Sequence, residues 1–331
     1  MAHWNGSQWL SVQSNTGNTI QGIWGSASND VWAVADGGVI LHWNGTQWSS
    51  VNSGTTTTLV GVWGSSASDI WVAGYDGTLL HGPGGGWTVV PSGSSHRLAR
   101  FWGSGPSDVW VVGYEGTILH GDGKSWTRTY PALEGDFRGV WGTSPSNMWA
   151  VSGGGKVGHW DGATWTSVST PTTNNLDDAW GYNANDVWAV GWNGSIVHWN
   201  GSAWTSVPSG TTNHLLGVWG AGPADQWAIG GSGTIQRWNG TQWATVPSGT
   251  AADLRAIWGS SANDIWIVGS SGTILRWEGS QWTPVTSGTS NILYGLWGNG
   301  PNNVWAAGSS GTTLYWNGTQ WQTRASGTSS D

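Results

Sequence analysis

A tryptophan-glycine pair recurs along this chain at a fixed interval, and this repeat limits the possible folds more than any other feature. The pair begins at eight positions, each 39 residues after the one before: Trp24, Trp63, Trp102, Trp141, Trp180, Trp219, Trp258 and Trp297. A second tryptophan always follows eight residues later, from Trp32 to Trp305, and a glycine six residues after that, from Gly38 to Gly311. One supersecondary unit is therefore repeated eight times without insertions or deletions.

Each unit is expected to form four short strands, a to d. In the second unit these cover residues 59–64, 70–74, 78–81 and 87–91, and the turns between them are rich in Gly, Asp and Asn. A four-stranded up-and-down sheet of this size cannot bury both faces alone, whereas a ring of such sheets can. We therefore predict an all-β fold, a single eight-bladed β-propeller over residues 1–331, built from 39-residue four-stranded up-and-down repeats.

The chain begins inside a repeat. The segment His3-Trp4-Asn5-Gly6 matches His42-Trp43-Asn44-Gly45, so we divide the propeller into a partial repeat, 1–19, and eight tandem repeats, 20–327. Nine candidate d strands are then available for eight blades. We expect residues 9–12 to pair with the last blade and close the ring, displacing or flanking the strand after Trp321. A monomer is predicted, with association through a redundant edge strand as the alternative.

Composition excludes several functional classes. With 33 tryptophans in 331 residues, a large ring surface must be buried, which argues against disorder. The absence of cysteine excludes disulfides and thiolate metal sites. Ten Lys and Arg against 18 Asp and Glu, with no basic stripe, argue against nucleic acid as a partner. No apolar run approaches about 18 residues, so no membrane partner is expected. The first residues lack the features of a signal peptide, although an extracellular or cell-surface location is favoured.

Catalysis has little support in the sequence. No Ser/His/Asp set, P-loop or His-Glu-x-x-His motif is present, and the constant spacing leaves no inserted catalytic loop. We predict a protein that is not an enzyme and that uses no cofactor or metal. One acidic column is open to a metal-binding interpretation, but it tolerates Asn, so we expect its side chains to close turns onto backbone N–H groups instead: Asp30, Asp69, Asp108, Asn147, Asp186, Asp225, Asp264 and Asn303.

The corner between strands c and d is the main candidate binding site. An indole beside hydrogen-bonding groups is suited to a pyranose, which has an apolar face and a rim of hydroxyls. Edge packing is the alternative, and the second and third repeats have glycine in place of this tryptophan, at Gly82 and Gly121. The candidate ligand-binding residues are Trp43, Trp160, Trp199, Trp238, Trp277 and Trp316, with the preceding His42, His159, His198, Arg237 and Arg276.

The repeat also resembles a known family. At Trp48, Val51, Gly54 and Ile70-Trp71, followed by Gly77-Thr78-Leu79, it is similar to tectonin-type repeats and related Trp-rich propeller lectins. This resemblance implies carbohydrate binding in shallow pockets between blades. The corner Asp161-Gly162-Ala163-Thr164-Trp165 looks like part of an Asp-box, as in sialidase-like and photosystem assembly-factor propellers. That motif has an Asp where this chain has Trp160, so sialidase catalytic residues carry over nowhere.

Two functions remain open. The first is a lectin-like module that binds glycans at several weak, equivalent sites. The alternative is a protein-interaction scaffold, which would use Tyr75, Tyr114 and Trp192, three aromatic residues in one column at the b–c turn. Arg138 and Asp177 occupy one column of strand a in consecutive repeats. They predict either an ion pair near the central channel or a site for a polar ligand or ion at its mouth.

Overall fold

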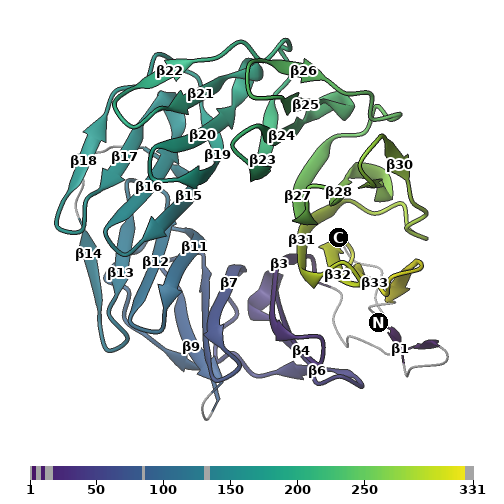
Figure 1. Cartoon of the computed structure of the whole chain (residues 1–331). Coiled ribbons are helices and arrows are strands. Elements are labelled where there is room, and N and C mark those ends of the chain that lie inside the picture. Colours follow the sequence, from purple (N-terminus) through teal and green to yellow (C-terminus); the bar gives the residue numbers. More distant parts are fainter. Residues whose placement is uncertain (1, 5–8, 12–17, 84–85, 130–134, 325–331) are drawn as a thin grey trace.

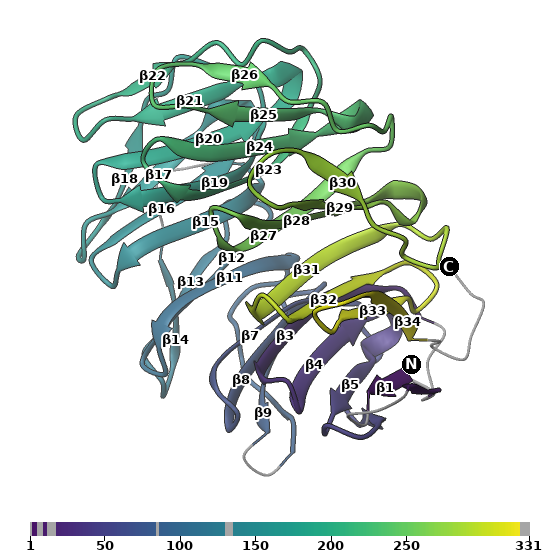
Figure 2. The same cartoon turned by 45° about the vertical axis from the view of Figure 1, so that its right-hand side comes forward.

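The structure, a computed structural model, describes residues 2–4, 9–11, 18–83, 86–129 and 135–324. Eight four-stranded antiparallel sheets form the blades of a ring around a central axis (Figure 1). The predicted all-β, eight-bladed propeller with its 39-residue spacing is thus confirmed. Each blade is made of four consecutive strands in the order a, b, c and d, from the axis outwards. Figure 2 shows the same ring from the side on which the last blade meets the first.

Strand a is the longest of each blade and lines the axis. The eight a strands are β3 (Ile20–Ala27), β7 (Leu59–Ser66), β11 (Leu98–Gly105), β15 (Phe137–Ser144), β19 (Leu176–Asn183), β23 (Leu215–Gly222), β27 (Leu254–Ser261) and β31 (Leu293–Gly300). The eight b strands are β4 (Asp30–Ala35), β8 (Asp69–Gly74), β12 (Asp108–Gly113), β16 (Asn147–Ser152), β20 (Asp186–Gly191), β24 (Asp225–Gly230), β28 (Asp264–Gly269) and β32 (Asn303–Gly308). Strand a of the second repeat extends two residues beyond the expected 59–64.

Strands c and d form the outer half of each blade. The c strands are β5 (Ile40–Trp43), β9 (Leu79–Pro83), β13 (Ile118–Gly121), β17 (Val157–Trp160), β21 (Ile196–Trp199), β25 (Ile235–Trp238), β29 (Ile274–Trp277) and β33 (Thr313–Trp316). The d strands are β6 (Trp48–Val51), β10 (Thr88–Val89), β14 (Trp126–Thr129), β18 (Trp165–Val168), β22 (Trp204–Ser206), β26 (Trp243–Thr245), β30 (Trp282–Pro284) and β34 (Trp321–Arg324). Five b–c turns contain a 3₁₀ turn, namely η1 (Asp36–Gly38), η2 (Gly153–Gly155), η3 (Trp192–Gly194), η4 (Gly231–Gly233) and η5 (Ser270–Gly272).

The core lies between blades rather than within them. One apolar cluster, for example, joins Trp32, Val34 and Ile40 of the first blade to Leu59 and Ile70 of the second, all 0–4% exposed. Each blade therefore buries both faces against its two neighbours, which a single sheet cannot do alone.

Two glycine columns explain why the repeat is so constant. A Cβ on Gly64 would lie 2.6 Å from the ring of Trp24, so the glycine of each Trp-Gly pair receives the indole of the preceding blade. The glycines of the b–c turn all have a positive φ, from Gly38 (74°) to Gly311 (62°), as expected for a turn that only glycine adopts without strain. At Gly77, a Cβ would also lie 1.8 Å from the carbonyl oxygen of Ser94.

Ring closure differs from the expectation. The last blade is completed by its own strand β34, and the N-terminal segment forms a separate two-stranded sheet of β1 (Ala2–Trp4) and β2 (Trp9–Ser11). This sheet lies beside β34, near the outer edge of the last blade (Figures 1 and 2). The outer place in that blade is already filled, so β2 does not pair there. Val12 and residues 325–327 lie outside the described residues. Side-chain packing joins the last blade to the first, since Trp305 and Ala307 share one cluster with Ile20 and Leu41.

Candidate functional site

The polar residues of the c–d corner are held by the acidic column of strand b. The Nε2 atom of His42 lies 2.7 Å from Oδ1 of Asp30, and His198 and Asp186 make the same contact at 2.7 Å. In the sixth and seventh blades arginine replaces histidine, and Arg237 donates from Nε to Asp225 at 2.7 Å. His159 and Arg276 bind Asn147 and Asp264 in the same way.

The acidic column therefore does not close turns onto the backbone as we expected. In the first blade, Asp30 accepts hydrogen bonds from the hydroxyl of Ser26 and from the indole N–H of Trp32 (3.1 Å), in addition to its contact with His42. The imidazole of His42 also stacks on Trp32, with 4.0 Å between ring centroids and 18° between planes. These contacts join strands a, b and c of the first blade. In the first seven blades the column residue contacts the His or Arg of strand c, so the column links strand b to strand c there. Among the described residues, no group of three His, Asp or Glu is arranged to hold a metal ion.

The corner tryptophans pack against the preceding blade. The ring centroid of Trp199 lies 4.8 Å from that of Trp149, and Trp316 lies 4.5 Å from Trp266. Trp43, Trp277 and Trp316 are 2–4% exposed, and Trp160, Trp199 and Trp238 are half-buried. Three of the six indoles are thus covered and three are partly covered, and their contacts with the preceding blade match the edge-packing alternative.

The two blades without a corner tryptophan fill the gap from strand d. Trp87 contacts Trp32 with 5.4 Å between ring centroids, and Trp126 contacts Trp71 at 4.8 Å. A Cβ on Gly82 would lie 2.9 Å from the ring of Trp87, and Gly121 has the same relation to Trp126. The loss of this tryptophan is a local repacking of the blade edge.

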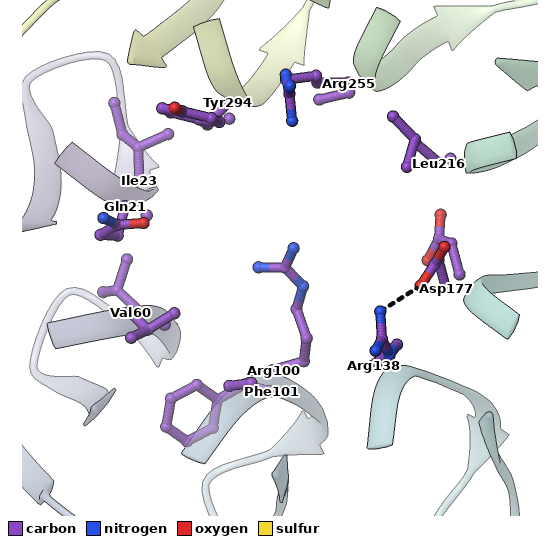
Figure 3. A pocket seen from close by; sticks show the side chains of 18 of the residues that line it. Gln21, Ile23, Val60, Arg100, Phe101, Arg138, Asp177, Leu216, Arg255 and Tyr294 are labelled. Carbon is purple, nitrogen blue, oxygen red and sulfur yellow. Dashed lines mark hydrogen bonds and ion pairs between the residues drawn. The ribbon is translucent and has the colours of Figure 1, made fainter. Parts of the chain in front are cut away.

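A cavity of about 560 Å³ lies on the axis and is lined mainly by the a strands. Figure 3 shows Ile23, Val60 and Phe101 on one side of it and the Arg138–Asp177 pair on the other. The guanidinium of Arg100 extends from β11 into the middle of this space (Figure 3). The cavity therefore has an apolar wall and a charged wall.

The charged wall contains the ion pair that one sequence column predicted. Arg138 donates from Nη1 to Oδ1 of Asp177 at 3.0 Å, which confirms the ion-pair alternative. Burial raises the pKa of Asp177 above its ordinary value, although Arg138 opposes this effect. Burial also raises the pKa of the neighbouring Asp178 to about 6, against a hydrogen bond from the backbone N–H of Val218 and the charge of Arg100. Asp178 is thus close to its titration range near pH 6.

The aromatic residues of the b–c turns surround one mouth of the cavity. The guanidinium of Arg97 lies over the rings of Tyr75 (4.9 Å) and Tyr114 (5.0 Å) and donates to the hydroxyl of Tyr114 at 3.2 Å. In the fifth blade, Trp192 stacks on His214, with 4.9 Å between ring centroids. We call this set of five residues the aromatic rim.

Three further residues, Arg138, Arg255 and Tyr294, also belong to the aromatic rim. Arg138 lies over Trp192 at 5.8 Å, and Arg255 over Tyr294 at 5.5 Å. Tyr75 and Trp192 are 41% and 39% exposed, so their rings are accessible. Sequence reasoning found the aromatic column but missed Arg97, His214 and Tyr294, whose only signal was that their own columns do not repeat.

Comparisons with known proteins support the fold alone. No protein-family model matches the chain, and no curated protein matches it, so the tectonin-type resemblance gains no family assignment. The computationally designed protein Ika8 is 16% identical, with a TM-score of 0.79 over 93% of this chain and 98% of its own. The C-terminal WD40 domain of Sif2 is 11% identical, with a TM-score of 0.70 over 95% and 97%. The structure described as YCF48 bound to D1 peptide is 19% identical, with a TM-score of 0.59 over 83% and 96%. The described residues include no helix long and apolar enough to span a membrane.

Proposed function

We propose that this propeller is a non-catalytic protein-interaction scaffold that binds a partner segment at the aromatic rim. The observation that carries the proposal is the gathering of exposed aromatic and cationic side chains around one mouth of the axial cavity. Tyr75, Trp192 and Tyr294 are 37–41% exposed there, in a molecule whose other aromatic rings are mostly packed between blades. Tyr, Trp and Arg are the residues that most often supply binding energy at protein interfaces.

The repeat pattern supports the same surface. The column of Tyr75 contains Ser270 and Ser309 in other blades, so the fold does not require an aromatic residue at this turn. Small polar residues at this position are therefore sufficient for the propeller to fold. Departures from the repeat in several blades that meet at one mouth indicate a role outside the fold.

The lectin-like alternative has weaker support. Its histidines and arginines are bonded to the acidic column, and its tryptophans are packed against the neighbouring blade. YCF48, one of the structurally similar propellers, is described as bound to a peptide, which supports a protein partner rather than a sugar. The likeness to YCF48 is one of fold.

The test uses a random peptide library displayed on phage and selected on the immobilised chain. Affinities of the enriched peptides are then measured by fluorescence anisotropy for the wild type and for the double variant Tyr75→Ser/Trp192→Ser. We expect the double variant to bind at least about tenfold more weakly, because interface aromatic anchors commonly contribute more than about 1.4 kcal/mol each.

Tyr182 provides the matched control. It is 53% exposed at the end of β19, near the a–b turn and thus on the opposite face, and its column contains serine in other blades. Tyr182→Ser should leave peptide binding unchanged. Weaker binding in this variant alone would place the interface on the other face. Glycan-array binding that is abolished by Trp199→Ala would instead favour the lectin function.

A further inference from the structure

The axial cavity reverses the charge balance of the chain. The whole sequence has 10 Lys and Arg against 18 Asp and Glu, a net charge of −8. The cavity, in contrast, is lined by Arg97, Arg100, Arg138 and Arg255 against Asp177 and Asp178. A concave site with an excess of one sign of charge attracts ligands of the other sign, so this cavity, with four arginines and two aspartates, favours an anion.

Three of these arginines have partners within the fold. Arg138 pairs with Asp177 at 3.0 Å, Arg97 lies against two tyrosines, and Arg255 lies 3.7 Å from Asp253. Arg100 is different, since no hydrogen bond or ion pair holds its guanidinium in the part of the chain that the structure describes. It is exposed within the cavity, and its interaction with Asp178 is through charge only.

Arg100 also departs from the repeat. Five of the other seven blades have glycine at its position, including Gly61 and Gly139 on either side, so the inner strand does not need a side chain there. Figure 3 shows the guanidinium directed into open space between the apolar and charged walls. A planar fork of N–H donors in this position is suited to a carboxylate, which it can bind through two parallel hydrogen bonds.

The apolar wall narrows the choice of anion. Ile23 and Val60 line the cavity opposite the ion pair, with Gln21 between them, and the space of about 560 Å³ is large enough for a few side chains. A carboxylate on a short alkyl stem fits both walls, whereas a strongly hydrated free phosphate would use only the charged one. Such a group occurs in the side chains of Asp and Glu and at the C-terminal residue of a chain.

We infer that the axial cavity is a carboxylate-binding pocket for an acidic segment of the partner protein, with Arg100 as its principal anchor and Arg255 as a second donor. The inference rests on the proposed function, because it requires a segment bound at the aromatic rim to reach the axis. The rim then supplies contact area, and the pocket supplies the preference for an acidic group.

The test uses fluorescein-labelled hexapeptide pools with one position fixed as Glu or as Gln, each made with a C-terminal acid and a C-terminal amide. We expect the wild type to prefer a carboxylate about tenfold, as for a charge-assisted hydrogen bond. This preference would appear either as tighter binding of the Glu pools than of the Gln pools, or as tighter binding of the C-terminal acids than of the C-terminal amides. Arg100→Gln should abolish this preference. A preference for Glu over Gln would identify a side chain as the source, and a preference for acid over amide a C-terminus.

Lys124→Gln is the control, because it removes one positive charge from an exposed turn at the outer edge of the third blade. It should retain the full preference, and thermal melting should show that both variants fold. Should Arg100→Gln melt well below the wild type, Arg255→Gln provides the second measurement, with a reduced preference expected.

Two failures are distinguishable. Pools that bind at the rim, lose affinity in Tyr75→Ser/Trp192→Ser and show no preference for carboxylate would overturn the pocket while leaving the scaffold function intact. An unchanged preference in Arg100→Gln would also overturn it. No binding of any pool to the wild type would contradict both proposals.

Discussion

The tryptophan layer between the blades is nearly the same in successive blades, whereas the residues that line the axial cavity differ from blade to blade. In the layer, most blades repeat the same contacts: Trp149 meets Trp199 of the next blade much as Trp266 meets Trp316. Around the axis, the residues of one column change from Val60 to Arg138 to Asp177 within a few blades. Eight equivalent interfaces must fit in one closed ring, so substitution there is costly, whereas the axial side chains face open space. In this molecule, constancy marks the fold and variation marks the candidate site.

The strongest test of this contrast compares two tryptophans four residues apart. Trp188 is 1% exposed within the layer, and Trp192 is 39% exposed at the rim. Trp188→Ala should lower the free energy of unfolding by about 3–5 kcal/mol, as for large buried aromatic residues. Trp192→Ala should lower it by less than about 1 kcal/mol. Chemical denaturation measures both, and equal losses would remove the distinction between layer and rim.

Two glycines of β11 test whether the tryptophan layer requires close packing. A Cβ on Gly103 would lie 2.6 Å from the ring of Trp63, whereas a Cβ on Gly105 would have no neighbour within 4 Å. Gly103→Ala should cost about 1–3 kcal/mol through overpacking. Gly105→Ala should be neutral or slightly stabilising, because it restricts the unfolded chain. Melting temperatures that rank the two variants the other way would contradict this account of the Trp-Gly pair.

Asp178 in the charged wall of the cavity should make the stability of the protein depend on pH. Because burial raises the pKa of Asp178 to about 6, the folded state binds this proton more tightly than the unfolded state, whose Asp has a pKa of 3.8. Its contribution therefore makes the protein more stable as the pH falls from 7 towards 4. Asp178→Asn keeps an acceptor for the N–H of Val218 and removes the charge. It should raise the free energy of unfolding at pH 7.5 by about 1–2 kcal/mol, with a smaller gain at pH 4.5. A gain of equal size at both pH values would show that the charge of Asp178 is not the cause.

The smallest expected effect on stability comes from a change in the acidic column of strand b, where it contacts the His or Arg of strand c. Six blades pair His or Arg with Asp, but His159 faces the neutral Asn147. Burial lowers the pKa of His159, with partial opposition from Asp161. Asn147→Asp supplies the partner of the other blades and should raise this pKa, with a change in stability below about 1 kcal/mol at pH 7. NMR titration of the imidazole measures the change, and an unaltered pKa would show that His159 does not interact with residue 147 as His198 does with Asp186.

The sequence predicted the blades well because each depends on local spacing. The 39-residue period and the Arg138–Asp177 pair both follow from columns of one repeat, and the structure contains each of them. The network of Asp30, His42 and Trp32 was missed because its members lie on different strands, and spacing alone does not show which side chains turn towards one another. For the same reason the contact of Arg97 with Tyr75 and Tyr114, which crosses columns and blades, was not foreseen.

Closure of the ring has a topological consequence. Among the strands that the structure describes, none of blade 8 pairs with one of blade 1, and Trp305 packs there against Trp43 and Trp48 as Trp266 packs against Trp316 and Trp321. The arrangement of the eight blades therefore does not depend on which blade comes first in the chain. Circularly permuted versions, which open the chain at any other d–a connection and link the present ends, would preserve all eight interfaces and the axial cavity. In such versions the residues of the aromatic rim would have different positions along the chain but the same arrangement in space.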